Sequence, residues 1–180
     1  WPDQRWRRGV ADIRVRMAET DTDLDLARAL CRDWLDWHWK AFPEDGPRVG
    51  NPMDPIAFED TIDRLPQIHA RPRGAILLAE VDDHPAGCVM YHEAGPDMAE
   101  IKRLFVNENG RGHGLGRLLL ERMFDAMIED GYGTVMFSSA RFLTHARRLY
   151  ESVGFRDIPH PAGFPDKHRD FVYFMERPLI

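Results

Sequence analysis

The sequence has few cysteines: only two among 180 residues, Cys31 and Cys88. The two lie far apart and form no close pair of the kind that ligates metals or defines a disulfide framework. This usage suits a reducing compartment, in which both thiols are buried as small apolar side chains. We therefore expect a cytoplasmic protein without a disulfide.

Long apolar runs and an excess of positive charge are also missing. No apolar stretch approaches the length of a membrane-spanning helix, and no secretory signal is visible. The formal net charge is −6, whereas general nucleic-acid binding needs a basic face. We expect neither a membrane nor a nucleic acid as a partner, although a local basic pocket is compatible with this charge.

The length predicts a single domain over residues 1–180, because a chain of this size fills one core. A composition of 43% hydrophobic and 30% charged residues is typical of soluble globular proteins. Residues 1–11 are polar, basic and aromatic, and we interpret them as a flexible arm.

Strand and helix patterns follow one another in the order β-α-α-β-β-β-α-β-α-β-β. Two-residue alternation of apolar side chains predicts the strands, and helical spacing predicts the helices. Hairpins come earlier in the chain and crossover helices follow them, and this order predicts an α/β fold of the α+β type with a mixed sheet. The expected strands are 12–18, 75–81, 86–92, 98–106, 134–139, 155–158 and 171–175, the helices are 24–38, 56–65, 114–130 and 144–153, and the main loops are 43–55 and 159–170.

The most distinctive run lies between the predicted strand 98–106 and the predicted helix 114–130. Glycine occupies every second position from Gly110 to Gly116, and Arg111 and Arg117 add fixed positive charge. Glycines let backbone N–H groups approach a ligand closely. The start of a helix carries unpaired N–H donors and partial positive charge. Together these features predict an anion site of the kind that binds phosphate.

Two common phosphate-binding motifs do not fit these residues. A nucleoside-triphosphate loop ends in Gly-Lys-Ser/Thr, whereas this one has Leu115-Gly116-Arg117. A dinucleotide-binding fingerprint has the pattern Gly-x-Gly-x-x-Gly after the first strand of a βαβ unit. Counted from Gly110 or Gly112, the third glycine position holds Leu115 or Arg117, and the loop follows a hairpin late in the chain.

A third motif fits. The stretch Arg111-Gly112-His113-Gly114-Leu115-Gly116 resembles the Arg/Gln-x-x-Gly-x-Gly/Ala signature of the GNAT superfamily of N-acetyltransferases. Residues 100–106 resemble the central strand of that superfamily, and residues 146–155 resemble its later helix and turn. The resemblance implies a mixed, mostly antiparallel sheet flanked by helices. It also implies that the fourth and fifth strands splay apart and admit the pantetheine arm of coenzyme A.

The resemblance implies acetyl-coenzyme A (acetyl-CoA) as co-substrate, and we expect no metal. Main-chain groups of Leu104, Phe105 and Val106 would meet the pantetheine and the acetyl carbonyl. Leu143 stands where many members have an asparagine that contacts coenzyme A, so that contact is not expected here. The residues whose backbone would hold the pyrophosphate are Arg111, Gly112, His113, Gly114, Leu115, Gly116 and Arg117.

Tyr150 matches the position at which many members protonate the departing thiolate. A phenol with a pKa of about 10 suits that role; the alternative is a buried aromatic residue that closes the helix against the sheet. Glu100 is the candidate general base, because an alkylammonium must lose a proton before it attacks. The alternative for Glu100 is an ion pair with Lys102 or Arg103. His92 and Glu93, at the end of the preceding strand, are weaker candidate bases.

Trp34 and His38 lie one turn apart in the first predicted helix, whose end borders the acceptor site in the superfamily. With His92 they are the candidate substrate-binding residues, and the alternative is an ordinary aromatic core. The loop 43–55 would cover that pocket.

The resemblance implies an N-acetyltransferase that moves an acetyl group from acetyl-CoA to a primary amine of a small molecule or peptide. Transfer would be direct, without a covalent enzyme intermediate, and the acidic net charge favours a cationic acceptor. The alternative is a non-catalytic acyl-CoA-binding sensor or regulatory module, against which Glu100 and Tyr150 count. A homodimer is a further expectation, since dimers are common in the superfamily.

Overall fold

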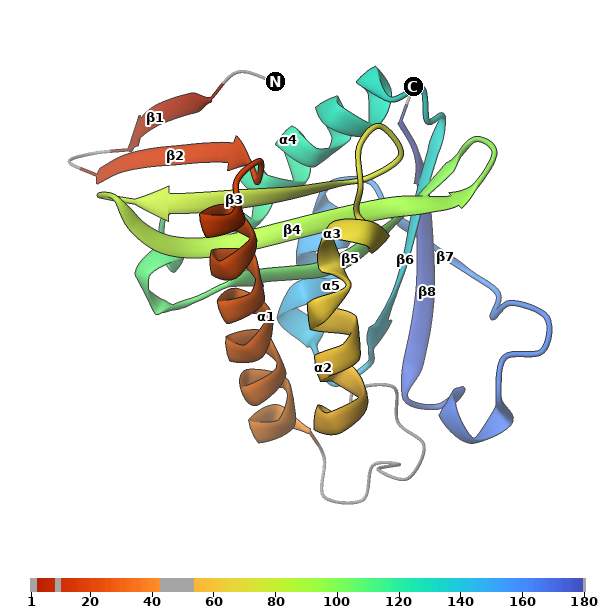
Figure 1. Cartoon of the computed structure of the whole chain (residues 1–180). Helices are drawn as coiled ribbons and strands as arrows, with labels where there is room; N and C mark the ends of the chain where they lie inside the picture. Colours follow the sequence, from red (N-terminus) through yellow and green to blue (C-terminus); the bar gives the residue numbers. More distant parts are fainter. Residues whose placement is uncertain (1–2, 9–10, 43–53, 180) are drawn as a thin grey trace.

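The computed structural model describes residues 3–8, 11–42 and 54–179 (Figure 1). The strands are β1 (Gln4–Arg8), β2 (Ala11–Met17), β3 (Ala75–Val81), β4 (His84–Gly95), β5 (Met98–Val106), β6 (Thr134–Ala140), β7 (Arg156–Ile158) and β8 (Val172–Pro178). The α-helices are α1 (Asp21–Ala41), α2 (Pro55–Asp63), α3 (Leu65–Ile68), α4 (Leu115–Glu129) and α5 (Thr144–Ser152), and short 3-10 helices cover Glu108–Gly110 and Asp166–His168.

The strands form one sheet in the order β1-β2-β3-β4-β5-β6-β8-β7. Neighbouring strands are antiparallel except β5 and β6, which are parallel. The mixed, mostly antiparallel sheet predicted from the sequence is therefore confirmed.

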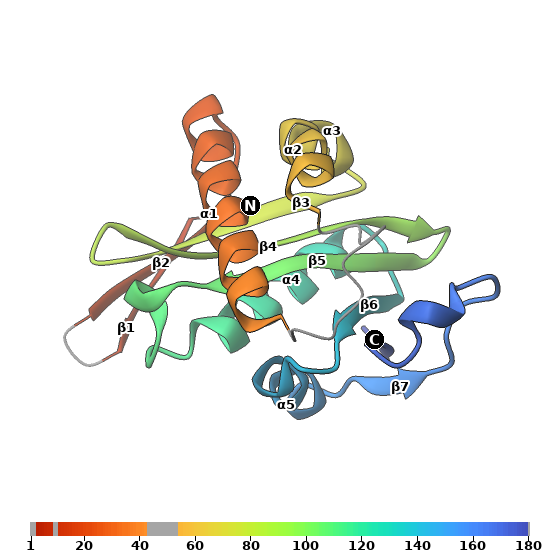
Figure 2. The same ribbon diagram turned by 90° about the horizontal axis from the view of Figure 1, so that it is seen from below.

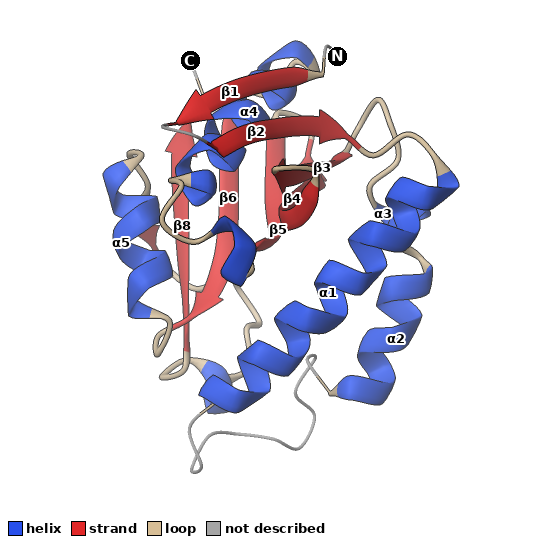
Figure 3. Ribbon diagram, turned by 90° about the vertical axis from the view of Figure 1, so that its left-hand side faces the viewer, coloured by secondary structure: helices blue, strands red, loops and turns tan. Residues whose placement is uncertain are grey.

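Helices cover both faces of this sheet (Figure 2). On one face, α1, α2 and α3 pack on an apolar cluster that includes Leu78 and Phe105, and both cysteines are buried there as free thiols. On the other face, α4 and α5 pack on a second cluster, to which they contribute Leu119 and Tyr150. Figure 3 shows α1 and α5 on opposite sides of the sheet, with the central strands between them.

The parallel strands β5 and β6 separate along their length. They pair only at Met98–Thr134, Ala99–Val135 and Glu100–Met136, although both strands continue beyond these pairs. The β4–β5 register also shifts beyond this point, and Arg103 has a φ of 51°, which together mark a β-bulge in β5. The splay expected of the fourth and fifth predicted strands is thus found between β5 and β6.

Two expectations for the N-terminal half are corrected. The flexible arm expected over residues 1–11 is wrong for Gln4–Arg8, which pairs with β2 as an edge strand. The strand was missed because most of its residues are polar, although its Trp6 packs against the core. The single helix expected over 56–65 is two helices joined at Arg64, because the ring of Pro66 and its missing N–H interrupt the first one.

Asp23 anchors the start of α1 to the sheet. Its carboxylate accepts hydrogen bonds from the N–H groups of Glu19 and Thr20, both at 3.0 Å, and pairs with Arg16 of β2. The hydroxyl of Thr20 in turn accepts from the N–H of Asp23 at 3.2 Å, which completes a capping box. Burial raises the pKa of Asp23, but these partners outweigh burial and lower it from 3.8 to about 2. These contacts tie the first turn of α1 to β2.

We expect the substitution Asp23→Asn to lower the free energy of unfolding at pH 7 by about 2 kcal/mol, because it removes an ion pair and weakens the cap. The folded-state pKa lies below the unfolded value of 3.8, so the contribution of the carboxylate is complete above that pH and is lost as the pH falls through about 2. The stability difference between wild type and variant, measured by urea unfolding, should shrink over this window.

The matched control is Asp25→Asn on the same helix, where the side chain is 76% exposed. We expect it to change the free energy of unfolding by less than about 0.5 kcal/mol. Equal stabilities of the two variants at pH 7 would contradict the anchoring role of Asp23.

Candidate active site

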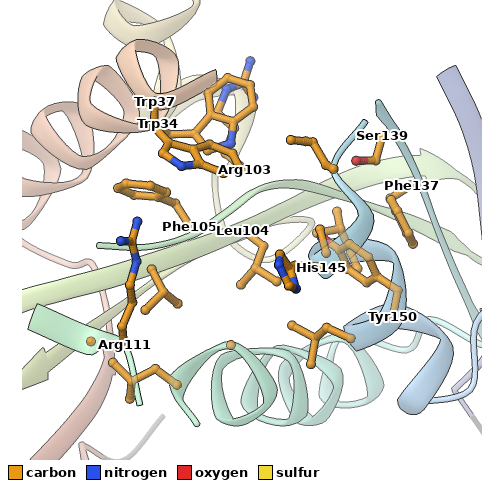
Figure 4. A pocket seen from close by; sticks show the side chains of 18 of the residues that line it. Trp34, Trp37, Arg103, Leu104, Phe105, Arg111, Phe137, Ser139, His145 and Tyr150 are labelled. Carbon is orange, nitrogen blue, oxygen red and sulfur yellow. The ribbon is translucent and has the colours of Figure 1, made fainter. Parts of the chain in front are cut away.

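A cavity of about 620 Å³ opens where β5 and β6 separate (Figure 4). Its walls are the second half of β5, the end of β6, the glycine run before α4, the first turns of α5 and two tryptophans of α1. Residues far apart in the sequence therefore meet at the gap in the sheet.

The glycine run forms one end of this cavity. Gly112 and Gly114 have φ values of 80° and 70°, in the left-handed region that favours glycine, and Gly114 is the N-cap of α4. No side chain of the described residues caps this helix, so its first N–H groups and its positive end remain available to a ligand. The predicted residues Arg111, Gly112, Gly114, Leu115 and Gly116 all line the cavity.

Two residues of the run, His113 and Arg117, do not line the cavity. The guanidinium of Arg117 donates to the hydroxyl of Ser152 at 2.8 Å, and neither Arg117 nor His113 belongs to the cavity lining. Arg111 lies at the cavity with its side chain 57% exposed, 3.8 Å from Glu108. Side-chain positive charge at this end therefore comes from Arg111.

The two long walls carry the groups predicted to meet the thioester. Leu104, Phe105 and Val106 line the cavity from β5, and Tyr150 lines it from α5. The ring of Tyr150 stacks on Phe137 of β6, with 3.8 Å between ring centroids. Burial raises the pKa of Tyr150 well above its usual value, so the phenol keeps its proton at neutral pH.

Glu100 does not belong to the cavity lining. Its carboxylate accepts a hydrogen bond from the ammonium of Lys102 at 2.5 Å and lies 3.4 Å from Nε2 of His92. Burial raises the pKa of Glu100, but His92 and Lys102 outweigh burial and lower it to about 2. A carboxylate with so low a pKa is a weak base, and the geometry favours the ion-pair alternative. His92 packs on His69 and also lies outside the lining.

The aromatic residues at the end of α1 divide between the cavity and the core. Trp34 lines the cavity as predicted, and Trp37, 38% exposed, lines it too. His38 is buried among aromatic rings that include Trp39 and Phe142, and burial lowers its pKa to about 4. The structure thus favours the core alternative for His38. Most of the 43–55 loop, the predicted cover of the pocket, lies outside the described residues.

Among the lining residues that were not candidates from the sequence, four carry polar or charged side chains: Arg103, Ser138, Ser139 and His145. The ring of His145 lies toward the middle of the cavity in Figure 4. It follows Leu143 by two residues, in the segment where the superfamily contacts coenzyme A, and that spacing is a signal that could have identified it. Arg103 lies inside a strand, where only the bulge brings it to the cavity.

No cluster of three or more His, Cys, Asp or Glu side chains suited to a metal ion occurs within residues 3–8, 11–42 and 54–179. Over the same part of the chain, no helix combines the length and the apolar character needed to cross a membrane.

The sequence profile of the acetyltransferase (GNAT) family matches residues 31–155. The chain belongs to this family. An uncharacterised N-acetyltransferase of Schizosaccharomyces pombe is 34% identical over 151 residues, which cover 81% of this chain and 84% of the relative. These two matches identify an acetyltransferase and confirm the resemblance found in the sequence.

Solved structures of the GNAT family share the fold. A Staphylococcus aureus acetyltransferase aligns with a TM-score of 0.71 at 18% identity, over 93% of this chain and 99% of that one. A PaiA N-acetyltransferase of Thermoplasma acidophilum, solved in complex with coenzyme A, aligns with a TM-score of 0.66 at 17% identity, over 92% and 98% of the two chains.

Proposed function

We propose that this acetyltransferase moves the acetyl group of acetyl-CoA directly to a primary amine of a small molecule or peptide. The observation that carries the proposal is the cavity between β5 and β6, which joins the uncapped start of α4, the separated backbone of β5 and the phenol of Tyr150. Each of these three parts fits a different part of the thioester substrate.

The start of α4 fits the pyrophosphate of coenzyme A. The N–H groups of the first turn of α4, Leu115 to Arg117, are capped by no side chain of the described residues. Together with the positive helix end they favour a doubly charged anion, and Arg111 adds a full charge. From there the pantetheine arm would follow β5, where main-chain groups of Leu104 to Val106 have no partner on β6. Its amides would pair with this strand in the manner of an added β-strand.

The thioester would then lie between β5 and Tyr150. The amine nitrogen attacks the acetyl carbonyl carbon, the C–S bond breaks, and the nitrogen loses a proton to water. A backbone N–H of β5 near Phe105 would stabilise the developing oxyanion. Tyr150 would donate a hydrogen bond and then its proton to the departing thiolate, and solvent would restore that proton. The products are an amide and the free thiol of coenzyme A.

The acceptor would enter from the side of α1, past Trp34 and Trp37, opposite the glycine run. The alternative of a non-catalytic sensor needs only the coenzyme site. The position of the Tyr150 phenol on the cavity wall and the N-acetyltransferase relative favour the enzyme.

Thiol release from acetyl-CoA, measured over a broad panel of primary amines, tests this function. We expect release that depends on the amine, and the variant Tyr150→Phe should lower kcat by about 100-fold, because the leaving thiolate loses its proton donor. The KM for acetyl-CoA should change by less than about twofold, since the ring still stacks on Phe137.

Tyr173→Phe is the matched control, because Tyr173 contacts the same Phe137 ring at 6.1 Å but does not line the cavity. Its kcat should equal that of the wild type. Binding of acetyl-CoA without release by any amine would support the sensor, and an unchanged kcat in Tyr150→Phe would remove Tyr150 from the acid role.

The role of Glu100 is tested by Glu100→Gln. Because Lys102 and His92 hold its carboxylate and its pKa is about 2, we expect kcat to fall by less than about tenfold, whereas loss of a general base removes about 100-fold or more. The rise of the rate from pH 6 to pH 9, set by deprotonation of the amine, should keep its shape.

Glu93→Gln removes a carboxylate of β4 that pairs with Arg73 and lies outside the cavity lining, and so controls for the loss of one carboxylate from the same sheet. A drop in kcat of about 100-fold in Glu100→Gln alone, at unchanged KM, would restore Glu100 as the general base.

A further inference from the structure

We propose that Arg103 binds a carboxylate of the acceptor, so that the favoured acceptors are amines that also carry a carboxylate group on an apolar skeleton. This inference rests on the proposed function, because it assigns the acceptor class of the same cavity.

The backbone of Arg103 is the first observation. Arg103 occupies the bulge of β5 with a φ of 51°, a left-handed conformation in which glycine is the least strained residue. A residue with a large side chain costs about 1 kcal/mol there. Strain of this kind is typical of functional positions. The bulge turns the arginine to the α1–α2 face, where its guanidinium lies over the ring of Phe58, 4.7 Å from the centroid.

The charge of Arg103 is the second observation. Within the described part of the chain, no carboxylate forms an ion pair or hydrogen bond with its guanidinium, and its buried Nε has no partner. Glu100, on the same strand, is already held by Lys102 and His92. Arginine keeps its charge in proteins, and a partly buried guanidinium gains most from a carboxylate that it binds through two parallel hydrogen bonds.

The walls beside Arg103 define the rest of the acceptor. Trp34, Trp37 and Phe105 line the cavity with Arg103, and the rings of Trp37 and Phe105 lie 6.5 Å apart. These faces suit an apolar or aromatic skeleton next to the charged group. Figure 4 shows Arg103 beside the tryptophans, with Arg111 and the glycine run on the other side of Phe105. The anions of coenzyme A therefore have their own site.

This local charge is opposite to what the whole chain suggests. The net charge of −6 favours a cationic acceptor. The guanidinium of Arg103, which pairs with no carboxylate of the described residues, favours a negative group at one end of that acceptor. An amino acid satisfies both, because it presents an amine to the thioester and a carboxylate to Arg103.

Calorimetric titration of the protein saturated with coenzyme A tests the carboxylate site without catalysis. The probes are 3-phenylpropionate and its neutral amide, 3-phenylpropionamide. We expect the carboxylate to bind about tenfold more tightly than the amide, and Arg103→Met to abolish that difference while it leaves the affinity for the amide unchanged. Equal affinities in the wild type, or a preference that survives in Arg103→Met, would overturn the proposal.

The controls separate charge, fold and coenzyme binding. Arg64→Met removes an exposed arginine of the α2–α3 junction and should change neither affinity. Arg103→Lys keeps the charge without the planar fork, and its affinity for the carboxylate should lie between those of wild type and Arg103→Met. It also provides the comparison if thermal unfolding shows that Arg103→Met does not fold. A tenfold loss of coenzyme A affinity in Arg103→Met would assign the arginine to the coenzyme instead.

Kinetics with L-phenylalanine and L-phenylalaninamide extend the test to acceptors. We expect Arg103→Met to raise the KM for the amino acid about tenfold, with a smaller change in kcat, and to leave the KM for the amide unchanged. Acetylation of both at equal kcat/KM by the wild type would overturn this inference and leave the proposed function intact. Absence of transfer to any amine would contradict the proposed function, and the titration would still decide the role of Arg103.

Discussion

The separation of β5 from β6 is the constraint on which the rest of this structure depends. The strands pair at three positions and then diverge, so the middle of the sheet presents unpaired backbone to a cavity rather than to a neighbouring strand. Buried backbone groups need partners, and the polar arm of a bound ligand would supply them. The bulge at Arg103 bends β5 at this place, and α5 packs beside the opening with Tyr150 stacked on Phe137 of β6.

The same separation joins two kinds of recognition in one cavity. At one end, the start of α4 provides N–H donors that no side chain of the described residues caps. The glycine run packs closely on the sheet there because residue 110 is glycine: a Cβ at this position would lie 2.7 Å from the carbonyl oxygen of Ala86. At the other end, the tryptophans of α1 and the guanidinium of Arg103 form an apolar and charged surface. The proposed transfer takes place between them, beside Tyr150.

The sequence predicted the elements better than the contacts between them. The bounds of β3 and β5 agree with the prediction because local signals mark their ends, such as Asp82 and Asp83, whose positive φ values of 51° and 62° form the hairpin turn. The glycine run could be identified from a local sequence signal as well. The surroundings of Glu100 and His38 depend instead on residues outside their own segments. His92, on the neighbouring strand, helps to lower the pKa of Glu100. Phe142, distant in the sequence, helps to bury His38. Arg103 was not predicted to line the cavity, because a β-bulge changes which face of the sheet a side chain occupies.

The most direct test of this account is a crystal structure of the protein with coenzyme A. We expect the pyrophosphate oxygens within hydrogen-bonding distance of backbone N–H groups between Arg111 and Arg117, the pantetheine amides paired with β5 at Leu104 to Val106, and the sulfur beside the hydroxyl of Tyr150. Coenzyme A bound away from the gap between β5 and β6, or bound there with its pyrophosphate away from the start of α4, would contradict the account.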